Sequence, residues 1–467
     1  MKRFGIVLLA LLFAQSIIKC SDDFDDNPSF GSVNNFIWKG LNLYYYWLPD
    51  SPDLADNRFD TRTDYENFIN SFNTPESLFN HLLVDQNIDR YSVIFSDYNA
   101  LEQALSGTQK SNGVDYELRY KQGSTTELFG WVRYIQPNSD AATKNIQRGD
   151  IFYAVNGISL NTANYTNLLN QDNYTLNLAN FDNGAITPNG NSVSLTKTNY
   201  SENPVYIKKV IVQGTKKIGY LMYNGFYGQY ENELNNAFGF FRSEGITHFV
   251  LDLRYNSGGS VNTATRLASM ITGQFNNQIF AKQQWNTKIE NLINNPEQLL
   301  NRFTNSIANG SAINHLNLDK VYVLTTKRSA SASELVINGL KPYINVIQIG
   351  DMTAGKNVGS ITLYDSPTFR KQNINPTHKY AMQPIVLKIA NNNDFSDYTN
   401  GLSPNVSQLE NLGNLGVLGN ETEPLLNTAL NYINTNGRTS QRIPNIVFNH
   451  FEDCKSMRLF GDEMYLD

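Results

Sequence analysis

The feature that most constrains the fold is a regular alternation of strand and helix patterns from residue 205 to residue 435. Short apolar runs between polar turns predict strands, and longer segments with apolar residues every three or four positions predict helices. The expected strands are 218–223, 247–253, 320–326, 346–350 and 360–364, and the expected helices are 230–243, 261–272 and 332–343. This order predicts an α/β domain at residues 204–435. Residues 283–318 interrupt it with a polar, helical pattern and are expected to form an inserted flap.

Two differently patterned regions precede the α/β domain. Residues 34–105 are rich in aromatic residues and read as helices with acidic first turns, at 63–69 and 75–82 among others, so an N-terminal helical domain is expected there. Its aromatic stripe could be a binding face, but the core of a helix bundle is the favoured interpretation. Residues 106–203 change to short strands and Gly/Asn turns and predict a β-rich domain. No fold is assigned to the C-terminal tail, residues 436–467.

The N-terminus predicts export. Lys2 and Arg3 precede the short apolar run 4–13, which fits a signal peptide at residues 1–20 and is too short for a spanning helix. Residues 17–20 resemble a bacterial lipoprotein signal, although Lys19 departs from that pattern, and the resemblance implies a lipid on Cys20. The acidic stretch within the polar tether, residues 21–33, resembles those of surface lipoproteins of the Bacteroides and Flavobacterium group. We therefore expect a cell-envelope lipoprotein, at the outer membrane, the cell surface or in the periplasm; plain secretion and a Cys20–Cys454 disulfide are the alternatives.

Composition excludes several classes of function. The chain carries a net charge of -6 and no long basic run, so nucleic-acid binding is not expected. Its five histidines are scattered and its two cysteines cannot build a zinc site, so neither a metal nor another cofactor is predicted.

A first motif ends the predicted buried strand at residues 249–253. The strand runs through Asp252 and Arg254 into a turn that contains Gly258 and Gly259. Sites in α/β sheets gather at the C-terminal ends of strands, and glycines let backbone N–H groups approach a ligand closely. Such donors can stabilise an oxyanion, whereas an ordinary strand-to-helix turn is the alternative.

Two further motifs carry a serine and a lysine. Ser331 stands in the middle of Ser329–Glu334, at the start of a predicted helix, where a hydroxyl is exposed and nearby amides can act as donors. Helix capping is the other reading, and it is the favoured one for Ser329 and Ser333. Lys356 follows a glycine turn between two apolar strands, where burial could lower a lysine pKa enough for it to act as a base. A solvated lysine is the alternative, and only the pairing with the serine motif argues against it.

Together the three motifs resemble those of the C-terminal processing peptidases, also called tail-specific proteases, which carry "D-L-R-x-N-x-G-G", "S-A-S-A-S-E" and "T-x-G-K" in this order. The resemblance implies a ClpP/crotonase-like α/β core with Ser331 as nucleophile and Lys356 as general base. It further implies oxyanion donors from the amide of Ala332 and from Gly258 or Gly259. Many members have a glutamine four residues after the lysine; here Ser360 stands there and could reach Lys356 through water only.

The β-rich region resembles a PDZ domain. The strand at 131–135, the turn at 136–142, "R-G-D-I" at 148–151 and "V-N-G" at 155–157 occur in the order of that module. A PDZ domain adds a peptide terminus to a sheet edge, and the resemblance places its carboxylate-binding loop near Leu128, Phe129 and Gly130.

The sequence thus predicts a multidomain α+β protein: a helical bundle, a PDZ-like domain and an α/β serine peptidase core. The expected function is cleavage of polypeptides by a Ser-Lys dyad through an acyl-enzyme, with an envelope lipid anchor at Cys20. A surface peptide-binding protein on an inactive protease-like core is the main alternative. An acyl-CoA enzyme of the crotonase type is a second one, which the export signal argues against.

Overall fold

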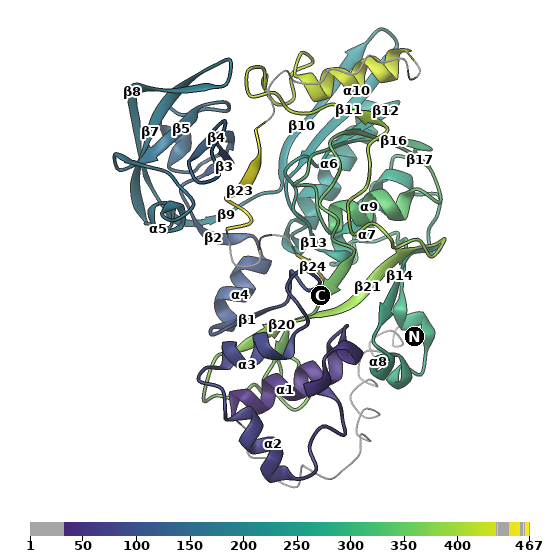
Figure 1. Cartoon of the computed structure of the whole chain (residues 1–467). Helices are drawn as coiled ribbons and strands as arrows, with labels where there is room; N and C mark the ends of the chain where they lie inside the picture. The colour runs from purple at the N-terminus through teal and green to yellow at the C-terminus, as the bar shows by residue number, and fades with distance from the viewer. Residues whose placement is uncertain (1–31, 436, 438–447, 458–460, 462, 467) are drawn as a thin grey trace. The chain divides into compact units, whose positions relative to one another are not determined.

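The computed structural model describes residues 32–435, 437, 448–457, 461 and 463–466, which form two compact units (Figure 1). Of the described residues, unit 1 contains 32–96, 284–298 and 362–387, and unit 2 contains the others. Residues 283–318, expected as one inserted flap, therefore contribute to both units. No helix among the described residues is both long enough and apolar enough to cross a membrane. Cys20 and the predicted signal peptide lie outside the described residues.

Unit 1 is mainly helical. Its helices begin at polar caps: the Thr74 side chain accepts the Ser77 N–H, and the Ser77 hydroxyl accepts the Thr74 N–H in return. One face of the first helix buries Phe36, Ile37 and Leu41. The elements are α1 (Val33–Tyr44), η2 (Leu48–Asp50), η3 (Pro52–Leu54), α2 (Arg62–Ile69), α3 (Pro75–Leu82) and α8 (Thr287–Leu292), with a sheet of β1 (Val93–Phe95), β20 (Ala381–Gln383) and β19 (Leu363–Tyr364).

A six-stranded sheet forms the centre of unit 2. Its order is β10-β11-β12-β16-β17-β22; the β10–β11 pair is antiparallel and the following pairs are parallel. Its strands are β10 (Val205–Gln213), β11 (Lys216–Tyr223), β12 (His248–Asp252), β16 (Lys320–Thr325), β17 (Asn345–Gly350) and β22 (Val406–Ser407). The helices are α6 (Glu231–Glu244), α7 (Val261–Thr272), α9 (Ala332–Leu340) and α10 (Pro424–Thr435). Parallel strands require such crossovers, and the C-terminal ends of β12 and β16 lead directly into the glycine and serine motifs.

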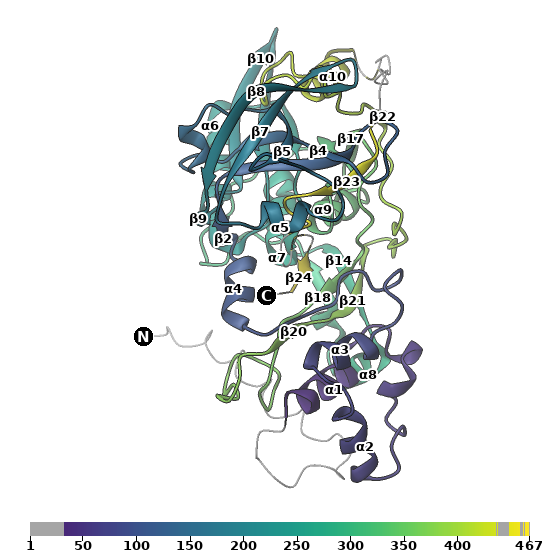
Figure 2. The same cartoon turned by 60° about the vertical axis from the view of Figure 1, so that its left-hand side comes forward.

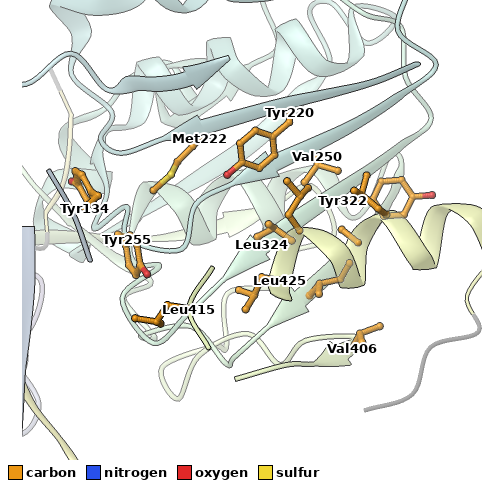
Figure 3. Packing of buried hydrophobic residues seen from close by; sticks show 14 of the residues in the cluster. Tyr134, Tyr220, Met222, Val250, Tyr255, Tyr322, Leu324, Val406, Leu415 and Leu425 are labelled. Carbon is orange, nitrogen blue, oxygen red and sulfur yellow. The ribbon is translucent and has the colours of Figure 1, made fainter. Parts of the chain in front are cut away.

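The apolar residues of α10 close one face of this sheet. Leu425 lies in one buried cluster with Val250, Leu324 and other strand residues (Figure 3), and Leu426 and Leu430 belong to the same cluster. The same cluster includes Tyr255 of the glycine motif and Tyr134 of the β-rich region, so it continues into that region (Figure 3). The burial of these apolar side chains is the main contribution to the stability of the core.

The β-rich region forms a second sheet in the order β23-β3-β4-β5-β7-β8, and Figure 2 shows β8, β7, β5 and β4 side by side. Its strands are β3 (Val114–Tyr120), β4 (Leu128–Ile135), β5 (Ile151–Val155), β6 (Ile158–Ser159), which pairs with β5, β7 (Asn173–Asp182), β8 (Ala185–Thr196) and β23 (His450–Asp453). Around it lie α4 (Tyr98–Leu105), η4 (Ala141–Thr143), α5 (Tyr165–Leu169) and the pair β2 (Thr108–Ser111) and β9 (Thr198–Ser201). The edge strand β23 comes from the C-terminal segment, which denotes the described residues 448–457, 461 and 463–466.

A third sheet has the order β13-β24-β18-β21-β14-β15. Its strands are β13 (Gly259–Ser260), β24 (Met464–Tyr465), β18 (Val358–Ser360), β21 (Ile385–Asn391), β14 (Ile279–Trp285) and β15 (Leu300–Arg302). The C-terminal segment thus supplies a strand here as well, between the glycine motif and the residues that follow Lys356.

Several expected elements differ from those observed. The single strand expected at 360–364 is wrong: β18 ends at Ser360, and β19 belongs to a different sheet. The helical pattern expected for 283–318 is also wrong, because α8 and the turn η6 (Pro296–Leu299) are the only helices described there. The remaining residues of that stretch bury few apolar side chains, so a packed helix face is missing.

Candidate active site

Ser331 occupies a strained turn at the start of α9. It is the N-cap of the helix and has φ 62° and ψ -118°, a region that L-residues rarely adopt. Its side chain is 0% exposed. Ala332 follows as the first helical residue, where the backbone N–H has no partner within the helix. The turn therefore presents a hydroxyl and an N–H together.

The neighbouring serines fix this turn to the end of β12. The Ser329 hydroxyl donates to the Leu253 carbonyl at 2.8 Å, and the Ser333 hydroxyl donates to the Asn256 carbonyl at 2.9 Å. The expectation that these two serines cap the helix is wrong, because Ser331 is the N-cap and their hydroxyls serve long-range contacts.

Glu334 connects the serine turn with the lysine turn. Its carboxylate accepts the backbone N–H groups of Ser331 and Lys356, each at 2.8 Å, and that of Gly355 at 2.7 Å. The Thr353 hydroxyl donates to it at 2.5 Å. Burial raises the pKa of Glu334 above its usual value, and these four hydrogen bonds, which favour the charged form, offset only part of that rise. The contacts of Glu334 with the lysine turn could not be predicted from the sequence, because they join residues about 20 positions apart.

The glycine turn lies against Ser331. Gly258 and Gly259 have φ 119° and 135°, and a Cβ atom on Gly258 would lie 2.6 Å from the Ser331 Oγ. The Gly258 N–H donates to the Asn256 side chain at 2.9 Å. The Gly259 N–H donates to the Glu463 carbonyl at 2.6 Å. Of the two, Gly259 is thus the one whose N–H binds a peptide carbonyl beside the serine.

Lys356 is buried and ion-paired with the C-terminal segment. Its side chain is 0% exposed, and its Nζ donates to Glu463 Oε2 at 2.8 Å. The Ser360 hydroxyl donates to the same carboxylate oxygen at 3.2 Å and to the Met464 carbonyl at 3.2 Å. Ser360 therefore approaches Lys356 through the Glu463 carboxylate. Sequence reasoning missed Glu463, because nothing in the local pattern relates the tail to the lysine turn.

Arg254 stabilises the strand that leads into the glycine turn. Its guanidinium is 0% exposed and forms ion pairs with Asp252 at 2.8 Å and with Glu423 at 2.7 Å. Glu423 also accepts the Leu426 N–H at 2.9 Å at the start of α10. The motif residue Arg254 thus joins the strand end to the last long helix.

The carboxylate-binding loop expected at Leu128, Phe129 and Gly130 is wrong. These residues lie inside β4 and pair with β3. A Cβ atom on Gly130 would lie 2.0 Å from the Phe152 ring, so glycine allows close packing here and does not mark a turn. Within the described residues, no group of three His, Cys, Asp or Glu is arranged to hold a metal ion.

Comparisons with known proteins agree with the arrangement of motifs. The family model "Peptidase family S41" matches residues 217–367, and "Peptidase S41 N-terminal domain" matches residues 32–93. The chain is a member of peptidase family S41. The family predicted from the three motifs, the C-terminal processing peptidases, is therefore confirmed.

Individual relatives of this S41 peptidase family member are distant. A probable CtpA-like serine protease of Staphylococcus epidermidis is 27% identical over 34% of this chain and 29% of its own length. The chloroplastic carboxyl-terminal-processing peptidase 1 of Arabidopsis thaliana is 22% identical over 47% of this chain and 42% of its own. The chain thus spans less than half of these curated relatives. A solved structure of an S41 protease candidate from Bacteroides fragilis is 26% identical, covers 90% of this chain and 100% of its own, and has a TM-score of 0.66.

Proposed function

We propose that this protein is a serine endopeptidase of the C-terminal processing type, with Ser331 as nucleophile and Lys356 as general base. The observation that carries the proposal is the Glu334 carboxylate, which accepts the backbone N–H of both residues at 2.8 Å. Two turns separated by 25 residues in the sequence are thereby held by one buried anchor. Both side chains are buried, and Ser331 lies against the turn of Gly258 and Gly259. Glu463 connects this turn with Lys356, because its carbonyl accepts the Gly259 N–H and its carboxylate accepts a hydrogen bond from the Lys356 ammonium.

In the proposed reaction, neutral Lys356 takes the proton of the Ser331 hydroxyl as Oγ attacks a peptide carbonyl. The negative charge on the former carbonyl oxygen is stabilised by the N–H groups of Ala332 and Gly259. Lys356 then passes the proton to the leaving amine, and the C–N bond breaks to leave an acyl-enzyme. Water, deprotonated by Lys356, hydrolyses the ester and restores the Ser331 hydroxyl.

The test compares Ser331→Ala and Lys356→Met with the parent protein on an unstructured peptide. Each variant should lower kcat/KM at least 100-fold while the thermal unfolding midpoint stays close to that of the parent. Cleavage by Ser331→Ala at the parent's rate would exclude Ser331 as the nucleophile. The substitution Lys327→Met, on the loop before Ser331, is a matched control for loss of one positive charge and should leave kcat/KM unchanged.

We further propose that the sheet of residues 114–196 is PDZ-like and binds extended peptides at the edge of β3. The antiparallel pairing of β23 with β3 supports this, because an extended segment is added there as in peptide recognition by strand addition. Binding of a labelled peptide terminus to the Ser331→Ala protein, measured by fluorescence anisotropy, tests it. A protein that binds such peptides but cleaves none would instead favour the inactive peptide-binding alternative.

Export with a lipid on Cys20 is proposed from the sequence alone. Metabolic labelling with a radioactive fatty acid in a bacterial host should label the parent protein and not Cys20→Ser. Labelling of both proteins would refute the assignment.

A further inference from the structure

The C-terminal segment adds a strand to each of two sheets: β23 at the edge beside β3, and β24 between β13 and β18. In β23, His450, Glu452 and Asp453 pair with Arg119, Leu118 and Glu117 of β3 in antiparallel register. In β24, Met464 and Tyr465 pair in parallel with Gly259 and Ser260, and Tyr465 also pairs with Ser360. Figure 1 shows β23 beside β3 and β24 beside β13. An extended peptide bound by strand addition would use the same backbone groups.

Buried charges hold the first part of the segment in place. The Asp453 carboxylate pairs with Arg133 at 2.7 Å and with Arg328, on the loop before Ser331, at 2.9 Å. Lys455 Nζ donates to the carbonyls of Asn224 and Tyr255 at 3.0 and 2.8 Å. These contacts hold the C-terminal segment against Tyr255, which shortly precedes the glycine turn in the sequence.

Glu463 contacts the two groups that a peptide substrate would need, the Gly259 N–H and the Lys356 side chain. Its carbonyl accepts the Gly259 N–H at 2.6 Å, which is the contact expected of a substrate carbonyl at an oxyanion site. A Cβ atom on Gly258 would meet both this carbonyl, at 2.5 Å, and the Ser331 Oγ, at 2.6 Å, so the two oxygens lie on the same side of the glycine. The Glu463 carboxylate meanwhile accepts a hydrogen bond from Lys356 at 2.8 Å.

The segment also closes the access to the site. A cavity of about 40 Å³ beside Gly258 and Gly259 is lined in part by Glu463 and Tyr465. Ser331 and Lys356 are both 0% exposed with the segment in place. An external peptide therefore cannot reach the serine while β24 stays between β13 and β18.

We infer that the C-terminal segment is a tethered, substrate-like inhibitor that must leave the cleft between β13 and β18 before an extended peptide can bind. The inference rests on the proposed function, since it assigns the cleft to substrate. The segment inhibits cleavage in two ways. First, β24 fills the cleft in which a substrate would bind. Second, the Glu463 carboxylate pairs with the ammonium form of Lys356, which cannot accept the proton of the Ser331 hydroxyl. A tethered competitor acts at a high effective concentration, so even a weak strand contact is sufficient.

The test places a charge in the buried strand of the full-length protein. Met464 is 0% exposed, so Met464→Asp should release β24, because an unpaired buried carboxylate is unfavourable. We expect kcat/KM for an unstructured peptide to rise at least 10-fold. Glu463→Ala, which removes the contact with Lys356 without adding a charge, should raise it severalfold. Val417→Asp, at a position that is 70% exposed, is the matched control and should leave kcat/KM unchanged.

A second readout is independent of catalysis. In the Ser331→Cys protein, alkylation of residue 331 by iodoacetamide, followed by peptide mass spectrometry, reports access to the site. Met464→Asp and Glu463→Ala should each accelerate it at least 10-fold, and Val417→Asp should not. Faster alkylation without cleavage by any variant would support the inference and refute the proposed function. If alkylation stays unchanged, or if both variants lower kcat/KM in a folded protein, β24 is a structural part of the site and the inference is overturned.

Discussion

Replacing Glu334 with glutamine is the sharpest perturbation of the proposed site. The carboxylate accepts four hydrogen bonds, two on each oxygen: Oε2 from the N–H groups of Ser331 and Lys356, and Oε1 from Gly355 and Thr353. The glutamine amide has one acceptor oxygen and one NH₂ group that can only donate. Two of the four donors therefore lose their acceptor and face another donor.

The magnitude follows from these contacts. A hydrogen bond to a charged group contributes about 1.5–3 kcal/mol, and the ionised carboxylate itself is disfavoured by burial, which offsets part of the loss. We expect Glu334→Gln to lower the free energy of unfolding by about 2–4 kcal/mol. Because the turns of Ser331 and Lys356 then lose their common anchor, kcat should fall about 100-fold with a small change in KM.

Urea unfolding and steady-state cleavage of an unstructured peptide measure the two effects. Glu233→Gln, which removes one carboxylate from an exposed position of α6, is the control and should behave as the parent protein. If Glu334→Gln matches the parent in both stability and kcat, the carboxylate does not hold the two turns, and the main support for the dyad is lost.

Three further substitutions test other parts of the structure. Gly258→Ala places a Cβ atom 2.6 Å from the Ser331 Oγ and should lower kcat/KM at least 100-fold; unchanged cleavage would contradict a nucleophile that lies against this turn. Glu423→Gln leaves the buried guanidinium of Arg254 partly unpaired and should cost about 3–5 kcal/mol in urea unfolding, whereas a loss below 1 kcal/mol would contradict a buried pair. Burial raises the pKa of Glu117, but neighbouring cations, chiefly Arg119, lower it to about 2 from 4.5. This carboxylate therefore contributes up to about 3 kcal/mol of stability above pH 4.5, which is lost as the pH falls towards 2. Glu117→Gln should flatten this dependence between pH 6 and 3, and an unchanged slope would refute the assignment.

The parts of the fold that local patterns determine could be predicted from the sequence. The helix expected at 261–272 has those bounds in the structure, because Ser260 caps it and its apolar residues recur with helical period. The strand expected at 247–253 is β12, since a buried parallel strand is a continuous apolar run. The glycine, serine and lysine motifs could be placed after predicted strands, and their roles were predicted from their resemblance to the motifs of the C-terminal processing peptidases.

The remaining parts depend on contacts between distant residues. β24 has only two residues and is stabilised by partners about a hundred or more positions away, so no periodicity marks it. Glu463 and Glu334 also act through contacts with distant residues. Neither could be singled out from the sequence, because a carboxylate in the first turn of a helix or in a tail is common. Gly130 was misread for a related reason: the ring that requires a glycine there, Phe152, lies on another strand.

The left-handed backbone of Ser331 bears on how this protein could be engineered. Such a conformation in a non-glycine residue costs about 1–3 kcal/mol, and glycine adopts it without that strain. A search that ranks substitutions by folding stability alone would therefore favour glycine at position 331 and delete the proposed nucleophile. A substitution that would raise the stability at this position is therefore one that a redesign should avoid.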